Sequence, residues 1–281
     1  MRKAVAAASF ALMSSLASTP VMAGTPYQED MICPIGGEKF KHTSTGSYST
    51  FGARPDGKPY GSWIFPMPIP VCPSNLLPIY GKFTPGEIAK LEPLVRSAEY
   101  RAMAAANKPY FNAAWLMERS GAKPEAIAWM IVQASWEADD QPQLKRTYQE
   151  AYVARIRALP DTGDASDWLF YQVRAANGLR ELSRFDEAAA MIATLHPRAR
   201  ALVTAAKADP LKNKDKDQLE KAEYLVRFLD KLAETSAARN PSSEPVTMLD
   251  PRSAKSMCKR EGSPLNDPDR AACAKLGFAP A

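Results

Sequence analysis

The chain has 281 residues, of which 46% are hydrophobic and 24% are charged, and its formal net charge is +5 at pH 7. This composition is typical of a globular protein long enough for one large or two small domains. Acidic residues are mixed among the basic ones along most of the chain. A nucleic-acid-binding protein would concentrate its basic residues in one stripe, so the pattern argues against nucleic acid as a partner.

Residues 1–23 have the pattern of a secretory signal peptide. A basic start is followed by an apolar stretch from Ala4 to about Leu16, and Val21-Met22-Ala23 places small residues where a signal peptidase cuts. A retained membrane anchor is the alternative, but the apolar stretch is shorter than the roughly 20 residues that span a bilayer, and no later segment is apolar enough to do so. We expect cleavage between Ala23 and Gly24 and a periplasmic or secreted protein without a membrane span.

Residues 24–83 are rich in Gly, Pro, Ser, Thr and aromatic residues and poor in helix formers. Two short runs, Tyr48–Phe51 and Ser62–Phe65, predict extended segments. The sequence Arg54-Pro55-Asp56-Gly57-Lys58 between them predicts a turn, because Pro presets one dihedral angle and Gly accepts a positive φ. The run Pro66–Pro70 cannot donate ladder hydrogen bonds, which predicts an extended strip at an edge. We expect a small, irregular β-rich head.

From Thr84 the composition changes to Ala, Leu, Glu and Arg, with helical periodicity almost to Ala238. Thr84-Pro85-Gly86-Glu87 predicts a helix start, with a Thr cap, Pro in the first turn and Glu three residues after the cap. Breaks that contain Pro, Gly or Ser predict helices at about residues 85–104, 108–120, 124–138, 142–158, 166–182, 185–206 and 216–238. Such short connections predict antiparallel packing of consecutive helices.

Internal repetition favours stacked helix pairs. Trp168–Pro197 has the spacing of a tetratricopeptide-type hairpin: alanines allow close approach, Phe185 after the turn fills the gap, and Pro197 follows the second helix. The segment Lys108–Ala138 has similar spacing. We expect residues 84–239 to form an α-solenoid of tetratricopeptide-like hairpins, so that the whole protein is mostly α. An ordinary helical domain is the alternative, since Ala-rich contact faces are common.

The four cysteines lie in two regions. Cys33 and Cys72 belong to the head, and Cys258 and Cys273 belong to a Pro-rich C-terminal segment, residues 240–281. An even number of cysteines in an exported chain predicts disulfides. We favour the pairs Cys33–Cys72 and Cys258–Cys273, because each bond then stays within one region and ties it down covalently.

A zinc site is the alternative for the head. Zinc is usually held by paired cysteines two residues apart. Gly36 and Asn75 occupy the partner positions here, and neither is a ligand. We therefore expect no metal and no cofactor.

Two motifs around the head cysteines resemble those of the domain-of-unknown-function family 2225. Cys33–Phe40 is similar to the knuckle Cys-Pro-x-Cys-Gly-x-x-Phe of that family, and Val71–Asn75 is similar to its second knuckle. The resemblance covers about residues 31–200 and implies a zinc-ribbon-like head followed by tetratricopeptide-like helices. This chain lacks the second cysteine of each knuckle, so we do not carry over the family's zinc and expect a disulfide in its place.

The sequence contains none of the common catalytic motifs, such as Gly-x-Ser-x-Gly, His-Glu-x-x-His or a phosphate-binding loop. Its two histidines are His42, in a polar loop, and His196, which we expect to cap a helix end before Pro197. A paired carboxylate site remains possible among the acidic residues Glu118, Glu125, Glu137, Asp139 and Asp140, although solvated helix faces explain them without chemistry.

The expected function is non-enzymatic binding of a protein or peptide partner in the cell envelope, since stacked helix pairs form extended surfaces. By tetratricopeptide spacing, the inner-facing residues of a peptide groove are Phe111, Trp115, Glu118, Phe170, Val173, Asn177 and Arg180. One alternative is an envelope hydrolase, possibly acting on glycan, that uses helix-borne carboxylates. Another is a purely structural envelope component.

Overall fold

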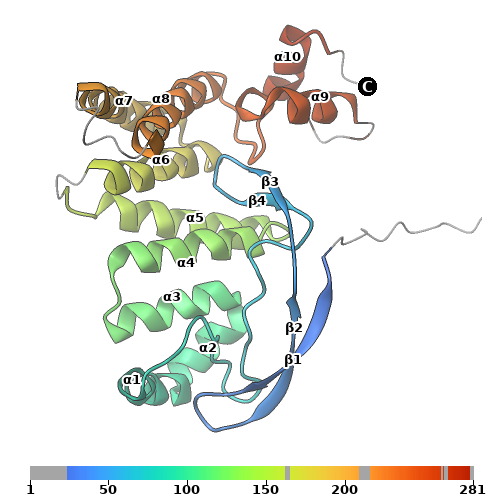
Figure 1. Cartoon of the computed structure of the whole chain (residues 1–281), viewed down its shortest axis with the longest axis vertical. Coiled ribbons are helices and arrows are strands. Elements are labelled where there is room, and N and C mark those ends of the chain that lie inside the picture. The colour runs from blue at the N-terminus through green and yellow to red at the C-terminus, as the bar shows by residue number, and fades with distance from the viewer. Residues whose placement is uncertain (1–23, 162–164, 209–215, 261, 263–264, 279–281) are drawn as a thin grey trace, which may run out of the picture.

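The computed structural model describes residues 24–161, 165–208, 216–260, 262 and 265–278. The predicted signal peptide lies outside these residues. Within them the chain is mostly helical, with two small β-sheets near the N-terminal end (Figure 1). None of the helices in the described ranges is both long and apolar enough to cross a membrane.

Helices α1 to α8 follow one another along the long axis of the molecule, and α9 and α10 lie at the end beside α7 and α8 (Figure 1). The helices are α1 Pro85–Arg96, α2 Ala98–Ala106, α3 Pro109–Ser120, α4 Pro124–Glu137, α5 Pro142–Arg157, α6 Ala165–Glu181, α7 Phe185–Ala208, α8 Lys216–Ala237, α9 Pro251–Lys259 and α10 Asp267–Lys275, with a 3-10 turn η1 at Val246–Met248.

The predicted helix at residues 85–104 is wrong, because the structure has two helices there. Ser97 ends α1, where its N–H donates to Leu94, and it also begins α2, where its side chain accepts from Tyr100 N–H. A serine can cap the next helix and so interrupt the helix before it, and the break follows Pro93, which lies in the last turn of α1. The remaining predicted helices begin and end within two residues of those observed.

Pro197 does not follow a helix, as the repeat pattern predicted, but lies inside α7. His196 therefore does not cap a helix end. Instead its Nε2 lies 2.7 Å from an Asp230 carboxylate oxygen of α8. A proline removes one intrahelical hydrogen bond. The burial of Leu195 and Ala199 on either side of Pro197 keeps α7 continuous despite that loss.

The β region is a pair of hairpins. Strands β1 (Pro26–Ile32) and β2 (Lys39–Thr45) pair antiparallel along their whole length, and β3 (Thr50–Ala53) pairs with β4 (Pro59–Gly61). The predicted run Tyr48–Phe51 overlaps β3 but begins and ends two residues early, Ser62–Phe65 follows β4 instead of forming it, and β1 and β2 were not predicted. Most β1 residues are exposed, so no apolar alternation marks this strand.

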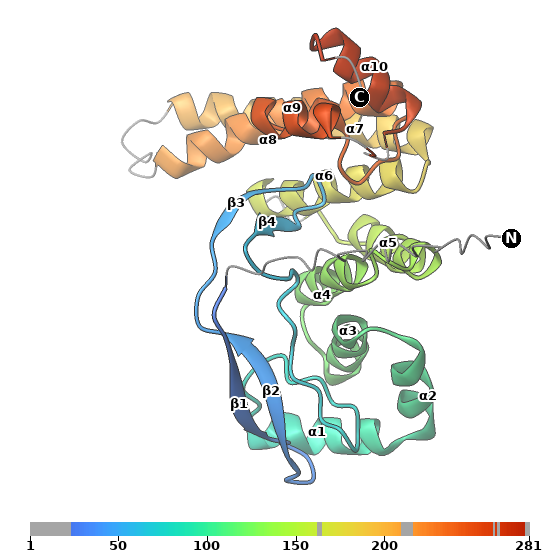
Figure 2. The same ribbon diagram turned by 90° about the vertical axis from the view of Figure 1, so that its right-hand side faces the viewer.

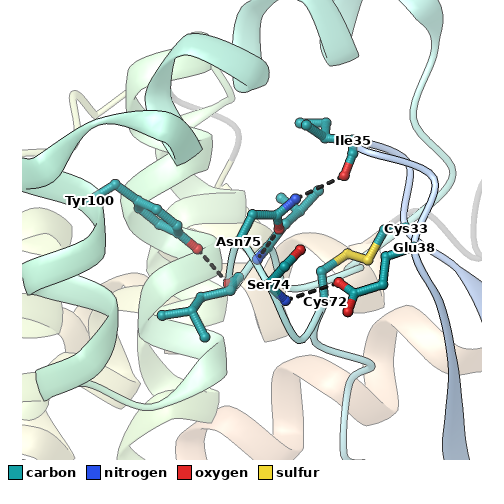
Figure 3. Close-up of a disulfide and its surroundings, with 9 residues drawn as sticks. Cys33, Ile35, Glu38, Cys72, Ser74, Asn75 and Tyr100 are labelled. Carbon is teal, nitrogen blue, oxygen red and sulfur yellow. Dashed lines mark hydrogen bonds between the residues drawn. A yellow bond between two sulfur atoms is a disulfide. The ribbon is translucent and has the colours of Figure 1, made fainter.

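The head packs against the first helices through its disulfide. Cys33 and Cys72 are bonded, as predicted, and their Cα atoms are 5.6 Å apart. Both cysteines are buried in one apolar cluster with Leu91, Val95 and Tyr100 of α1 and α2. The Tyr100 hydroxyl donates to the Leu76 carbonyl at 2.7 Å, next to the disulfide (Figure 3). The head and helices therefore share a hydrophobic core.

Residues 62–71 run as a strip without helix or strand beside the helices, between them and the β1–β2 hairpin (Figure 2), and residues 72–77 then form a turn. The Tyr110 hydroxyl of α3 donates to the Met67 carbonyl at 2.8 Å, and Ile69 packs against the core of α3 to α6. Within the strip, only Val71 forms a β-bridge, to Pro78. The predicted extended strip is thus held by helix side chains.

The C-terminal segment forms η1, α9 and α10 around the predicted second disulfide, Cys258–Cys273, whose Cα atoms are 5.7 Å apart. Asp269 is buried and accepts hydrogen bonds from the Asn240 side chain at 2.7 Å and from Val246 N–H at 2.9 Å. A covalent bond and a buried carboxylate therefore hold this segment in place.

Candidate functional site

The tip of the β3–β4 hairpin, residues 54–58, places a charged cluster against the helices. Arg54 is 7% exposed and donates to the carboxylates of Asp56 and Asp139, with its Nη1 2.8 Å from Asp139 Oδ2. The Lys58 and Lys145 ammonium groups lie 2.6 and 2.8 Å from the Asp139 carboxylate. Burial raises the pKa of Asp139, but Arg54 and Lys145 outweigh it and hold that pKa well below its usual range. Asp139 is thus an ionised anchor for the tip.

Arg180 of α6 is fully buried and connects this helix to the chain after α8. Its Nη1 donates to the carbonyls of Asn240 and Ser242 at 2.6 and 2.7 Å. Its Nε and Nη2 donate to Asn177 Oδ1 at 3.0 and 2.8 Å. The Glu181 carboxylate lies 3.5 Å from Nη2. A buried guanidinium is tolerated only with its donors satisfied in this way.

The Glu181 side chain is almost fully buried beside Arg180. Its carboxylate accepts hydrogen bonds from Gln149 at 2.6 Å and from Asn177 at 2.8 Å. Burial and then the negative charge of Asp56 raise the pKa of Glu181, against the opposing charge of Arg180. This carboxylate is therefore held by neutral donors as well as by a cation.

A cavity of about 20 Å³ lies between the hairpin tip and helices α4 to α6. Asp56 and Glu181 line it, together with Ser135, Gln149 and Arg174. A space of this size has room for about one water molecule. Two carboxylates meet here, but a sugar ring does not fit, so the cavity does not support the glycan-hydrolase alternative.

Glu137 ends α4 and accepts a hydrogen bond from Tyr110 N–H, in the first turn of α3, at 3.0 Å. Burial raises the pKa of Glu137 from 4.5 to about 7, partly opposed by that hydrogen bond and by the charge of Lys108. The folded protein therefore keeps a proton here at pH values where the unfolded chain has released it.

We expect the stability of the wild-type protein to fall as pH rises from about 4.5 to about 7, because the folded state binds the additional proton in this window. Glu137→Gln removes the titrating group and should reduce this decline by on the order of 3 kcal/mol. Urea unfolding at pH 5 and pH 8 measures the difference. Glu29→Gln, on the exposed strand β1, should leave the wild-type slope unchanged. An unchanged slope in Glu137→Gln would refute the assignment.

A groove lies between the first half of α7 and the end of α8 and encloses about 460 Å³. We call it the α7–α8 groove. It is lined by apolar and small residues with charged residues among them, namely Phe185, Asp186, Ala189, Ile192, Ala193, His196, Ala233, Ser236, Ala237 and Arg239.

Polar and charged side chains occupy defined places in the α7–α8 groove. Ser236 is 2% exposed, and its Oγ has no hydrogen-bond partner among the described residues. The Arg239 guanidinium lies 4.9 Å from the Phe185 ring centre and 3.8 Å from an Asp186 carboxylate oxygen. An apolar hollow with a few fixed polar groups is the usual form of a binding site.

Comparison of the chain with models of protein families, with curated proteins and with solved structures found no match in any of the three. The resemblance to the domain-of-unknown-function family 2225 therefore stays a prediction. The groove and the charged cluster have to be interpreted from their own geometry.

The predicted groove residues of α6 mostly point inward. Val173 is buried in the core that α6 shares with α7 and α8. Asn177 and Arg180 are buried as well: Arg180 donates to the carbonyl of Asn240 after α8, and Asn177 accepts from Arg180. Phe170 alone of these four is exposed, at 38%, with the Arg174 guanidinium 4.2 Å from its ring centre. Of the four predicted groove residues of α6, only Phe170 is therefore accessible to a bound peptide.

The predicted groove residues of α3 face different neighbours. Phe111 stacks on Tyr148 of α5, with ring centres 4.5 Å apart. Glu118 accepts from Arg155 of α5 at 2.8 Å. Trp115 packs against Tyr100 of α2, and Arg119 lies 3.5 Å over its ring. The α3 set therefore contacts α2 and α5, whereas in the α6 set Val173 packs against α7 and α8 and Arg180 holds the chain after α8.

Sequence reasoning missed both the charged cluster and the α7–α8 groove. The hairpin tip was interpreted only as a turn, and no sequence pattern indicates that Arg54 reaches Asp139, 85 residues later. The sequence does contain a pattern that indicates the α7–α8 groove. Ala189 and Ala193 in α7, and Ala233 and Ala237 in α8, repeat at a spacing of four residues on exposed positions.

Proposed function

We propose that this protein is an exported, non-enzymatic binding protein that holds an amphipathic helix of a partner protein in the α7–α8 groove. The observation that carries the proposal is the groove itself, in which a buried Ser236 hydroxyl without a partner lies beside an apolar floor. The two disulfides indicate an oxidising, extracytoplasmic compartment. Together with the signal pattern of residues 1–23, they support a periplasmic or secreted location.

A helix fits the α7–α8 groove better than an extended strand. Four alanines line it, two from each helix, and small side chains allow a third helix to approach two others closely. The α7 lining runs from Phe185 to His196, which corresponds to about three helical turns or roughly 17 Å. The groove can therefore hold three turns of a partner helix, and Ile192 and Phe185 supply apolar contacts for its large side chains.

The polar groups of the groove give the bound helix its register. The Ser236 hydroxyl can donate to or accept from one polar side chain of the occupant, and that bond would satisfy a buried group that is unpaired now. Asp186 and Arg239 lie 3.8 Å apart at one end, and the 99% exposed Asp186 carboxylate can accept from a second basic residue there. We expect an occupant with an apolar face, one polar residue opposite Ser236 and a basic residue near Asp186.

We infer that helices α3 to α8 are an α-solenoid of tetratricopeptide-like hairpins whose last pair, α7 and α8, offers the groove. The connections between successive helices from α3 to α7 are short, which supports stacked hairpins. In such an array each helix pair is covered by the pair that follows it. The last pair has no following pair and therefore keeps one uncovered face.

The head supports descent from a zinc-ribbon-like domain. The N–H of Cys33 and of Cys72 donates to the carbonyl five residues later, at 2.8 and 2.9 Å, and each cysteine carbonyl accepts from the N–H four residues later, at 3.2 and 3.0 Å. The residues at that fourth position, Gly37 and Leu76, have φ of 68° and 60°. Two matching turns thus meet at one disulfide (Figure 3). We infer that this bond replaces a four-thiolate metal site.

A display library of helical peptides with apolar residues at i, i+3, i+4 and i+7 tests the groove. The mature protein, with its disulfides intact, should enrich peptides from this library. Ala193→Arg fills the groove and should raise the Kd of the best peptide by about tenfold or more. Ser236→Ala should raise it by about fivefold through one lost hydrogen bond. Fluorescence anisotropy with a labelled peptide measures both constants.

Ala89→Arg, at an exposed position of α1, is the matched control and should leave the Kd unchanged. Circular dichroism and thiol titration verify that each variant is folded with its disulfides formed. If no peptide is enriched, or if Ala193→Arg binds the selected peptide as tightly as the wild type does, the α7–α8 groove is not the docking site. A structural role without a groove partner would then account for the protein better.

A further inference from the structure

Helix α9 carries a basic stripe on its exposed side. Arg252, Lys255, Ser256 and Lys259 follow one another at the spacing i, i+3, i+4 and i+7, which places them on one helix face, and Arg260 follows directly after the helix. All five are exposed, and together they line one shallow depression of the surface. We call this set the α9 basic face.

The four cations of the α9 basic face have no carboxylate partner among the described residues. The nearby acidic side chains are engaged elsewhere. Asp250 caps the N-terminus of α9, Asp267 pairs with Arg270, and Asp269 is buried between Asn240 and Val246. Glu261, which follows in the sequence, lies outside the described residues. The basic charge of α9 is therefore not neutralised by the carboxylates placed around it.

Buried residues and a disulfide hold the α9 basic face in a fixed position. Ala254 and Cys258, on the other side of the helix, are buried, and Cys258 is bonded to Cys273 of α10. The Lys259 ammonium lies 5.9 Å from the Phe278 ring centre, which directs this side chain along the surface. Because the disulfide fixes α9 relative to α10, the charges stay together on one side of the C-terminal segment.

We propose that the α9 basic face docks the protein on an anionic lipid bilayer through the phosphates of the lipid headgroups. Charge complementarity carries this inference, since four exposed cations grouped on α9 and the residue after it fit a surface of dense negative charge. The depression they line is shallow and has no apolar residue in its lining, so it presents charge without an apolar pocket. The α7–α8 groove is formed by other residues, so the two sites can act independently.

Vesicle sedimentation with the mature, disulfide-bonded protein tests this proposal. The protein should bind vesicles in which about one third of the lipid is phosphatidylglycerol and should not bind pure phosphatidylcholine vesicles. The bound protein should be released as the salt concentration rises from about 50 to about 500 mM. A basic residue near such a surface contributes about fivefold to the partition constant, so Lys255→Gln with Lys259→Gln should reduce it by about 25-fold. Added inorganic phosphate should compete only weakly with the vesicles, because each phosphate ion binds one cation of the α9 basic face at a time.

Lys90→Gln with Lys123→Gln is the matched control, since both lysines are exposed and lie in or near the first helices. This variant should bind as the wild type does. Failure of the wild type to prefer anionic vesicles at low salt would overturn the proposal, and so would equal binding by the Lys255→Gln, Lys259→Gln protein. Binding of a poly-glutamate peptide without any binding of vesicles would identify an acidic protein as the occupant and would equally refute the bilayer.

Discussion

Arg180→Ala should lower the free energy of unfolding by about 3–5 kcal/mol, the largest effect we expect from a single side chain. The guanidinium is completely buried and is hydrogen-bonded to the carbonyls of Asn240 and Ser242. Without it, both carbonyls lose a charged donor, and Glu181 keeps a buried negative charge without its nearest cation. Denaturant unfolding monitored by circular dichroism measures the loss.

Arg184→Ala is the matched control for this experiment. Arg184 lies four residues further along the chain and forms an ion pair with Glu187 at 2.7 Å, but both side chains are substantially exposed. Such pairs contribute at most about 1 kcal/mol. In addition, Glu181→Gln combined with Arg180→Ala should recover part of the loss, because the uncompensated charge is then gone. Equal effects of Arg180→Ala and Arg184→Ala would contradict the structural role given to Arg180.

Replacement of Cys33 and Cys72 by alanine should lower the free energy of unfolding by about 4 kcal/mol. The bond closes a loop with a sequence separation of 39, and its sulfur atoms are buried against α1 and α2. Replacement of Cys258 and Cys273, which are 15 residues apart, should have a smaller effect of about 3 kcal/mol.

The two double variants should also differ in where they unfold. Loss of Cys33–Cys72 should expose the amides of the head and of α1 and α2 to hydrogen exchange, because these elements share one core. Loss of Cys258–Cys273 should affect η1, α9 and α10, which share a second core. Exchange that spreads equally over the whole chain in both variants would show that the disulfides do not act on these local cores.

The helices were predictable because their signals are local. The capping box of Thr84 and Glu87 at the start of α1 was predicted from the local sequence, and Pro begins α3, α4 and α5. Both disulfides followed from the regional distribution of the cysteines. Ser97 was missed because helix-forming residues continue on both sides of it, and only its hydrogen bonds reveal its position.

The charged cluster and the groove could not be derived in the same way. Arg54, Asp139 and Arg180 come from segments far apart in the sequence, and their partners are known only once the helices are packed. The spacing argument also misassigned the orientation of α6. Arg180 and Asn177 fit a solvent-facing pattern, but the chain after α8 returns to accept from Arg180, and Asn177 is buried beside it. Local periodicity identifies a helix face, whereas tertiary packing decides what that face contacts.

A photo-reactive side chain at position 193 tests the central claim most directly. Ala193 lies in the α7–α8 groove, and Ala89 of α1 provides an equivalent exposed control position. With the protein in its own envelope fraction, irradiation should link position 193, but not position 89, to an amphipathic helix of one partner protein. Peptide mapping of the adduct identifies that helix. Equal adducts from both positions, or none from position 193, would contradict helix binding in the groove.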